Sequence, residues 1–319
     1  MQGVLLDFAT LSFADDVSVA PIRDVLDRCE VYPTTDAAQL PGRLADAEVV
    51  ITNKIPLDAA ALAAAPQLKL ICLAATGYNN VDIDIARERG IAVANIRDYC
   101  TAAVTQHVFA LLLALNQHLD GYRALLHEGG WRASPQFTML DYPFHELAAR
   151  TLGILGHGTL GQAVARAAEA FGMQVLVAQR PGGDDSRPGR VPLEELLERV
   201  DVLSLHCPLT AETEGLIDAA ALRRMRQDAL LINTARGAVV DEAALAAALR
   251  AGEIGGAGID VLSQEPPAGG NPLLAGDIPN LIVTPHIAWA SIEARRRAVD
   301  EIAANTAAFR RGERRNRVD

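Results

Sequence analysis

The amino-acid sequence predicts an α/β protein with two doubly wound domains, each built on a parallel β-sheet that helices cover on both faces. Two observations lead to this fold class. The chain has 319 residues, which is too long for one ordinary hydrophobic core and suits two domains. Short apolar runs alternate with alanine-rich helical stretches along nearly the whole chain, and this alternation is typical of buried parallel strands joined by helices.

The first series of strands and helices occupies the first hundred residues and ends near Tyr99. Its apolar runs predict strands at residues 3–8, 48–53, 68–76 and 91–96. Helical stretches such as residues 21–29 and 57–66 lie between them. The N-terminal run contains Asp7 and follows no basic segment, so it is interpreted as a first strand and not as a secretory signal peptide.

A long helix and an irregular arm follow the first series. Apolar residues at helical spacing predict the helix over residues 101–119. Residues 127–150 contain Gly-Gly and proline loop signals together with several aromatic residues. We interpret them as a connecting arm outside the strand–helix alternation. An exposed aromatic arm is often a subunit contact, and packing of the arm on its own domain is the alternative.

A second series of strands begins at residue 151. Its predicted strands are residues 151–155, 173–179, 200–207, 229–235, 255–262 and 281–286. Residues 291–312 are predicted to form a single long amphipathic helix.

Charge and hydropathy argue against several classes of partner. The net charge is −11, and no basic field exists that could hold a phosphate backbone, so nucleic-acid binding is not expected. The basic cluster at residues 310–317 is interpreted as a solvated helix end and tail in preference to a binding patch. The longest apolar run, residues 108–115, is far below the roughly 20 residues that a membrane span needs, so no membrane partner is expected.

The four cysteines indicate a reducing compartment. Cys29, Cys72, Cys100 and Cys207 are scattered without the spacing of metal ligands. We interpret them as reduced thiols of a cytoplasmic protein that has no metal site.

A glycine-rich turn opens the second series. Residues 156–161 read GHGTLG, between a predicted strand and a predicted helix. In this context Gly156 allows the tight turn, Gly158 lets the backbone approach a pyrophosphate, and Gly161 lets helix and strand pack closely. The helix N-terminus offers N–H groups and a positive dipole end to phosphates. The sequence therefore predicts a dinucleotide site, and a purely structural turn is the alternative.

The residues after the next strand bear on the choice of cofactor. A residue that holds the ribose 2′-hydroxyl of NAD is usually acidic, but the chain has Gln179 and Arg180 there. Gln179 does not repel a 2′-phosphate, and Arg180 can pair with one. This pair favours NADP over NAD, or a loose preference between them.

Three polar residues follow three strands of the second series. Arg236, Glu265 and His286 each come just after a predicted strand end, and such ends share the ligand-binding edge of a parallel sheet. A guanidinium holds a carboxylate or polarises a carbonyl. A histidine protonates the carbonyl oxygen as hydride arrives, and a carboxylate orients the imidazole and favours its charged form. Taken singly, each residue has a purely structural alternative, as a strand cap, a turn residue or a buried histidine.

Five sequence blocks resemble signature blocks of the D-isomer-specific 2-hydroxyacid dehydrogenases. They are ATGYNNVD (75–82), HCPLTAET (206–213), NTARG (233–237), DVLSQEPP (260–267) and TPHIAW (284–289). The similarity covers nearly the whole chain and is greatest to the glycerate dehydrogenase or hydroxypyruvate reductase branch. It implies that a Rossmann nucleotide-binding domain, residues 101–286, is inserted in a flavodoxin-like substrate domain made of residues 1–100 and 287–319. Many members are dimers clasped through the arm, so the resemblance also implies a homodimer.

The resemblance implies an activity and a set of roles. The expected reaction is hydride transfer between NAD(P)H and C2 of a small 2-oxo or D-2-hydroxy acid, with hydroxypyruvate or glyoxylate as the expected substrate. Arg236 would bind substrate, His286 would be the acid and base, and Glu265 its partner. Backbone N–H groups around Ala75, Thr76 and Gly77 would hold the substrate carboxylate. The implied cofactor contacts are Gly156, Gly158, Thr159, Leu160, Gly161, Gln179, Arg180, His206, Cys207, Pro208, Thr213, Thr234, Ala235 and, near the nicotinamide, Asp260.

Two alternatives remain for the function. One is a dehydrogenase of the same fold that acts on another 2-oxo acid, on formate or on phosphite. Formate has no C2 alcohol and does not need a His–Glu proton relay. The other is a nucleotide-sensing binding protein without enzymatic activity, against which the presence of Arg236, Glu265 and His286 argues.

Overall fold

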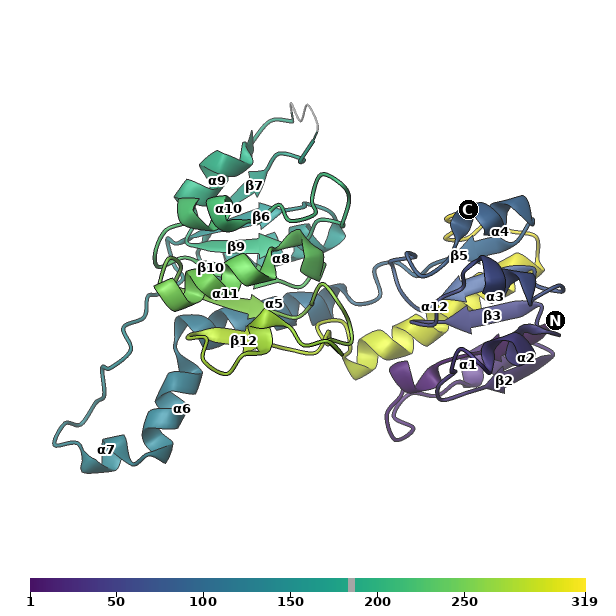
Figure 1. Ribbon diagram of the computed structural model, residues 1–319, viewed down its shortest axis with the longest axis horizontal. Helices are drawn as coiled ribbons and strands as arrows, with labels where there is room; N and C mark the ends of the chain where they lie inside the picture. The colour runs from purple at the N-terminus through teal and green to yellow at the C-terminus, as the bar shows by residue number, and fades with distance from the viewer. Residues whose placement is uncertain (183–186) are drawn as a thin grey trace. The chain divides into compact units, whose positions relative to one another are not determined.

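A computed structural model describes residues 1–182 and 187–319 (Figure 1). The described chain divides into two compact units, one made of Met1–Cys100 and Trp289–Asp319 and the other of Thr101–Ala288. In each unit the described strands form a parallel sheet, which confirms the predicted fold class. The chain returns to the first unit after Ala288, where the sequence predicted the boundary after His286.

The sheet of the first unit has the strand order β2-β1-β3-β4-β5, which is the flavodoxin-like order. Its strands are β1 (Gln2–Leu5), β2 (Arg28–Val31), β3 (Val49–Thr52), β4 (Leu70–Leu73) and β5 (Ala92–Ala94). Every residue of β3 and β4 is buried. This is why these two interior strands are continuous apolar runs in the sequence.

Strand β2 was not predicted. The sequence predicted a helix over residues 21–29, but helix α1 (Ala20–Asp24) is shorter, and Arg28–Val31 pairs with β1 instead. β2 lies at the edge of the sheet, and its residues alternate between exposed and half-buried. It therefore lacks the continuous apolar run that marks a buried strand.

Short helices connect these strands, and one long helix completes the unit. The short ones are η1 (Phe8–Thr10), α2 (Leu40–Leu44), α3 (Ala59–Ala63) and α4 (Ile83–Glu88). The predicted terminal helix is present as α12 (Ile292–Arg310), and the Ser291 side chain caps it by accepting a hydrogen bond from the N–H of Ala294. Helix α12 packs against α1 and β4 and so ties the C-terminal segment to the first unit (Figure 1).

The basic tail after α12 is docked on the first unit. Arg317 forms an antiparallel bridge with Ala94 of β5, and the N–H of Val318 donates to the carbonyl of Val93 over 2.9 Å. Four of its five arginines pair with acids of the same unit, as Arg310–Asp27, Arg311–Glu313, Arg315–Glu301 and Arg317–Asp319. The expectation of a solvated tail is therefore corrected, because these pairs and backbone bonds anchor it.

The sheet of the second unit has the strand order β12-β11-β10-β9-β6-β7-β8. Its strands are β6 (Thr151–Leu155), β7 (Gln174–Ala178), β8 (Arg190–Val191), β9 (Val202–Leu205), β10 (Leu230–Asn233), β11 (Gly256–Ile259) and β12 (Leu281–Val283). Starting from β6, the chain runs outward to β8 and then returns to build the other half. This is the doubly wound order of dinucleotide-binding sheets, with one further strand. The six predicted strands are present, and the two-residue β8 was not predicted.

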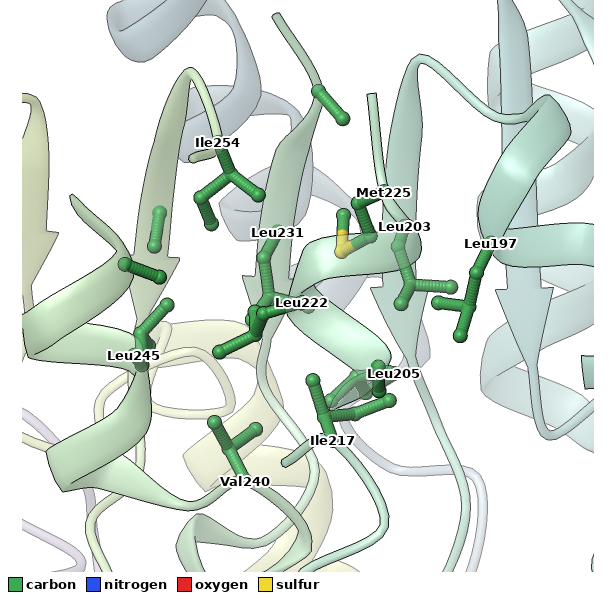
Figure 2. Close-up of a cluster of buried hydrophobic side chains, with 14 of the residues drawn as sticks. Leu197, Leu203, Leu205, Ile217, Leu222, Met225, Leu231, Val240, Leu245 and Ile254 are labelled. Carbon is green, nitrogen blue, oxygen red and sulfur yellow. The ribbon is translucent and has the colours of Figure 1, made fainter. Parts of the chain in front are cut away.

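Helices cover both faces of this sheet. On one face lie α9 (Leu193–Arg199), α10 (Ala219–Arg224) and α11 (Glu242–Ala251), which bury an apolar cluster against β9, β10 and β11. Figure 2 shows Leu222 of α10 among Leu203, Leu205 and Leu231 of the strands. On the other face lie α5 (Thr101–Asn116) and α8 (Thr159–Ala170), which pack on each other and on the sheet.

The predicted long helix ends earlier than expected. Helix α5 stops at Asn116, and His118 adopts a left-handed backbone conformation with φ of 49° before α6 (Leu119–His127) begins. The helix predicted over residues 101–119 is thus present over residues 101–116, and a separate helix begins after the break at His118. In the part of the chain that the structure describes, no helix is long and apolar enough to cross a membrane.

The arm begins earlier than the predicted residues 127–150: it comprises residues 117–147 and includes α6 and the short α7 (Gly130–Ala133). Figure 1 shows α6 and α7 extending away from the sheet of their own unit. The arm packs on itself through Tyr122 and Tyr142, whose ring centroids are 5.0 Å apart. Its large apolar side chains Leu119, Leu126, Trp131, Phe137, Leu140 and Phe144 are exposed, and Phe137 is 92% exposed.

Candidate functional site

The glycine-rich turn joins β6 to α8, and two of its glycines are required by the fold. Gly156 has φ of 95°, and a Cβ there would lie 2.5 Å from the backbone nitrogen of Cys207. A Cβ on Gly161 would lie 2.1 Å from the carbonyl oxygen of Gly156. A Cβ on Gly158 would meet no described atom within 4 Å. Packing therefore explains Gly156 and Gly161, whereas Gly158 leaves open space in front of the backbone.

The N-terminus of α8 faces this open space without a side-chain cap. Gly158 is the N-cap residue, and the first turn contains no acidic residue. The N–H groups of Thr159, Leu160 and Gly161 belong to the first turn of the helix, where they have no intrahelical partner. Such an end binds phosphate readily, because its N–H groups and dipole both favour negative charge.

A cavity of about 810 Å³ adjoins this turn. Its volume falls within the range of cofactor and ligand sites, roughly 300–1,000 Å³. Eight residues predicted to contact the cofactor line it, namely Gly156, Gly158, Gln179, Arg180, His206, Cys207, Pro208 and Thr213. The other predicted contacts Thr159, Leu160, Gly161, Thr234, Ala235 and Asp260 do not line this cavity.

Three arginine side chains line the cavity. Arg180, Arg187 and Arg190 line it together with His157. The Arg190 guanidinium donates to the carbonyl of Ala178 over 3.2 Å and lies 3.5 Å from Nδ1 of His157. Burial, assisted by the charges of Arg190 and Arg187, lowers the pKa of His157. The site is therefore more cationic than the pair Gln179–Arg180 alone indicated.

The opposing charge at the cavity comes from Glu212. A hydrogen bond from Thr210 lowers the pKa of its carboxyl, and the charge of Arg180 acts in the same direction. The contributions of His157, Arg187 and Arg190 were missed from the sequence. Arg190 lies on β8, a two-residue strand with no apolar pattern, so the sequence carried no signal for its position.

Two buried polar atoms of the predicted cofactor set lack a protein partner. Among the described residues, the buried side-chain atoms without a hydrogen bond are Thr101 Oγ1, His206 Nδ1 and Thr234 Oγ1. His206 bonds at its other nitrogen to Ser204 Oγ over 2.9 Å, and its burial lowers its pKa to about 4. A buried polar atom without a partner is costly. Residues of the predicted cofactor set thus present two polar atoms that a ligand can satisfy, which fits a bound dinucleotide.

The predicted catalytic residues follow three neighbouring strands. Arg236 comes after β10, Glu265 after β11 and His286 after β12, and these strands are adjacent and in register. The loop after β10 also packs closely on the loop after β11, because a Cβ on Gly237 would overlap the backbone of Leu262 at 1.9 Å. All three residues therefore leave the same edge of one sheet.

Glu265 and His286 form a direct pair. Nδ1 of His286 lies 2.6 Å from Oε2 of Glu265, and Oε1 of Glu265 accepts the N–H of Leu262 over 2.9 Å. The carboxylate is therefore anchored to its own loop while it binds the imidazole. A carboxylate at Nδ1 places a proton on that nitrogen and leaves Nε2 to exchange a proton with a ligand. Both side chains are about one-third exposed, so the pair is open to solvent.

Arg236 is held by the backbone of its own loop. Its guanidinium Nη1 donates to the carbonyl of Ala235 over 2.6 Å, and the side chain of Asn233 binds the carbonyl of Arg236 and the N–H of Ala235. Asp260 is buried in the turn that carries His286. Burial would raise the pKa of Asp260, but bonds from His107, Thr284, Ala288 and Ile287 hold it below its usual value.

The predicted substrate loop belongs to the first unit and follows β4. The carbonyl of Ala75 accepts from the N–H of Ile96, the carbonyl of Thr76 accepts from the side chain of Asn95, and the Thr76 hydroxyl donates to the carbonyl of Ile96. Within the described residues, the N–H groups of Ala75, Thr76 and Gly77 donate to no protein acceptor. The loop is thus fixed through its carbonyls, and these three N–H groups remain available to a ligand.

The amino-acid sequence is similar to that of proteins of one known family. The family described as D-isomer specific 2-hydroxyacid dehydrogenase, NAD binding domain, matches residues 109–288. The chain is 46% identical over 290 residues to a glycerate dehydrogenase of Methylorubrum extorquens, a match that covers 91% of each chain. It is 39% identical to a hydroxypyruvate reductase of Blautia hydrogenotrophica, again over 91% of each chain.

A solved structure is similar over nearly the full length. It is the NADPH-dependent glyoxylate/hydroxypyruvate reductase of Sinorhizobium meliloti in complex with NADP and malonate. The TM-score is 0.82 at 30% identity, and the match covers 99% of this chain and 96% of that one.

The buried His206 makes the stability of the second unit depend on pH. Its folded-state pKa of about 4 lies below the value near 6.5 of an unfolded histidine, so the unfolded chain binds the proton first as the pH falls. His206 should therefore lower the free energy of unfolding by up to about 3 kcal/mol as the pH drops from 6.5 to 4. Urea unfolding of the wild type and of His206→Asn over this range measures the effect as the difference between the two pH curves. Parallel curves would show that His206 is not buried as a neutral side chain.

Proposed function

Because the chain belongs to the D-isomer specific 2-hydroxyacid dehydrogenase family, we propose that this NAD(P)-dependent oxidoreductase reduces hydroxypyruvate or glyoxylate to the corresponding hydroxy acid. The contact between Glu265 and His286 carries the proposal, since it supplies an oriented proton donor after neighbouring strands. The relatives that the chain resembles over most of its length are named for these reactions. The overall reaction consumes one 2-oxo acid, one NAD(P)H and one proton.

Each residue of the candidate site has a separate role in the proposed reaction. A bound nicotinamide cofactor supplies hydride transfer to or from C2. His286 donates the proton to the carbonyl oxygen from Nε2 and takes it back during oxidation, and Glu265 orients the ring and stabilises the imidazolium. The Arg236 guanidinium binds the substrate and polarises its carbonyl. The free N–H groups of Ala75, Thr76 and Gly77 bind the substrate carboxylate in this proposal.

A substrate panel separates this function from its alternatives. The decrease in the near-ultraviolet absorbance of NADH or NADPH should be fastest with hydroxypyruvate or glyoxylate, compared with pyruvate and phenylpyruvate. Oxidation of formate or phosphite, or binding of the nucleotide without turnover of any acid, would replace the proposal with another function on the same fold.

The variant His286→Gln tests the proton donor. It should lower kcat for reduction by ~10²–10⁴-fold, the usual contribution of general acid catalysis, and leave the Kd for NAD(P)H nearly unchanged. Steady-state kinetics and fluorescence titration measure these two quantities. His127→Gln, on helix α6 of the arm, is a matched control that should keep full activity. A near-normal kcat in His286→Gln would refute the assignment.

We propose NADP as the preferred cofactor. Gln179 brings no charge against a 2′-phosphate, and Arg180, Arg187 and Arg190 line the same cavity. Several positive groups around a phosphate favour its binding through charge-assisted hydrogen bonds. The NADP-bound relative from Sinorhizobium meliloti is consistent with this preference.

The variant Gln179→Asp tests the preference directly. A carboxylate at this position repels a 2′-phosphate and can accept bonds from the ribose hydroxyls of NAD. The ratio of Kd for NADPH to Kd for NADH should rise by on the order of tenfold, since a change of ~1.4 kcal/mol corresponds to that factor. Glu212→Gln is the opposing control and should lower the ratio, because it removes the acid of the cavity. An unchanged ratio in both variants would rule out charge at this cavity as the selector.

We propose that the protein is a homodimer that buries its arm against a second copy, in agreement with the resemblance. Among the described residues of the second unit, most of the exposed large apolar side chains lie within residues 117–147, and burial of apolar area stabilises association. The proposed location is the cytoplasm, because all four cysteines are free thiols.

A charge placed on the arm tests the dimer. Leu140→Glu replaces a side chain that is 77% exposed and should convert the dimer to a monomer in light-scattering measurements of molar mass. Phe13→Glu is the control, because Phe13 is 82% exposed but lies in the first unit, outside the arm. A monomeric wild type, or a Leu140→Glu variant that stays dimeric, would contradict the proposed interface.

A further inference from the structure

The turn that carries His286 is held in a disfavoured backbone conformation. His286 has φ of 56°, in the left-handed region, and such conformations cost of order 1–3 kcal/mol in residues other than glycine. Its N–H points back to the carbonyl of Asp260 at 2.8 Å and to that of Thr284 at 3.0 Å. Something in the surrounding structure must therefore stabilise this turn.

The Asp260 carboxylate ties down both sides of the turn. Oδ1 accepts the hydroxyl of Thr284 over 2.6 Å and the N–H of Ile287 over 2.9 Å, and Oδ2 accepts the N–H of Ala288 over 2.9 Å. Asp260 is 1% exposed, so water competes little for these bonds. One buried carboxylate therefore fixes residues before and after His286.

His107 of helix α5 contacts both the Thr284 hydroxyl and the Asp260 carboxylate. Nε2 of His107 lies 2.9 Å from Oγ1 of Thr284 and 3.4 Å from Oδ1 of Asp260. His107 lies on the helix that packs against β11 and β12, the strands from which Asp260 and His286 follow. The helix can therefore hold the turn against the body of the sheet.

The direction of the hydrogen bonds identifies the protonated nitrogen of His107. A threonine hydroxyl has one hydrogen, and Thr284 gives it to the ionised Asp260, which can only accept. Thr284 Oγ1 must then accept from His107. Nε2 of His107 consequently carries a proton, and the donor chain runs from His107 through Thr284 to Asp260.

We propose that His107 is a positioning residue for proton transfer. Through Thr284 and Asp260, its Nε2–H holds the left-handed turn that aims His286 at Glu265. The inference rests on the proposed function of His286 as the proton donor. His107 does not itself exchange the proton in the reaction, since its Nε2 is committed to Thr284.

Two substitutions of His107 test the role. His107→Leu removes the donor and should lower kcat for reduction about tenfold while the Kd for NAD(P)H and the KM for the 2-oxo acid change less than about threefold; tenfold corresponds to ~1.4 kcal/mol in the barrier. His107→Gln offers an amide N–H at a similar reach and should recover most of kcat. Thermal unfolding and cofactor titration show whether each variant is folded. A wild-type kcat in folded His107→Leu, or an equal loss in both variants, would overturn the proposal.

A double variant separates this inference from the proposed function. If His107 acts through His286, His107→Leu should lower kcat in the wild-type background but have no further effect in His286→Gln. A further loss in that background would show that His107 acts elsewhere. A His286→Gln variant with normal kcat would instead remove the proposed function itself.

A spectroscopic measurement tests the hydrogen-bond direction without any cofactor. Imidazole ¹⁵N spectra of the free protein should show a protonated Nε2 on His107 that is lost from the spectrum in His107→Leu. A His107 Nε2 without a proton would contradict the donor chain.

Discussion

The candidate chemistry depends on the in-register pairing of β10, β11 and β12. Asn233, Ile259 and Val283, which end these strands, are successive partners across the sheet. Because all three strands are parallel, the chain leaves each of them on the same side. Arg236, Glu265 and His286 therefore start from one edge although long stretches of sequence separate them. A shift of one strand by a single residue would turn its side chains to the other face and would separate the acid from the imidazole.

The glycines of the dinucleotide turn are explained in two different ways, some by the packing of the fold and one by space for a ligand. Gly156 and Gly161 are necessary because backbone atoms approach them too closely for a side chain, whereas Gly158 faces open space. The unpartnered atoms of His206 and Thr234 lie in the same predicted set. Residues that the protein's own packing does not explain thus indicate where a ligand belongs. The arginines that line the cavity add positive charge, which also favours a ligand with phosphate groups.

The turn at His286 illustrates how a small strain is balanced by a buried acceptor. A left-handed histidine is costly alone, but the Asp260 carboxylate binds the backbone on both sides of it. Because these bonds lie inside the protein, they are stronger than they would be in water. The imidazole can therefore keep its contact with Glu265 while both side chains remain open to solvent.

The sequence by itself determined the fold class, the two strand series, the glycine turn and the three polar residues after strand ends. These features are local, since each depends on hydrophobic periodicity or on a short motif. Tertiary structure alone decided the edge strand β2, the break at His118, the docking of the tail and the positions of Arg190 and His107. Each of these depends on a partner far away in sequence. An edge strand such as β2 needs no apolar run, so periodicity does not reveal it. The sequence also cannot show whether a polar helix residue such as His107 faces water or contacts a buried carboxylate; only the folded chain distinguishes these two cases.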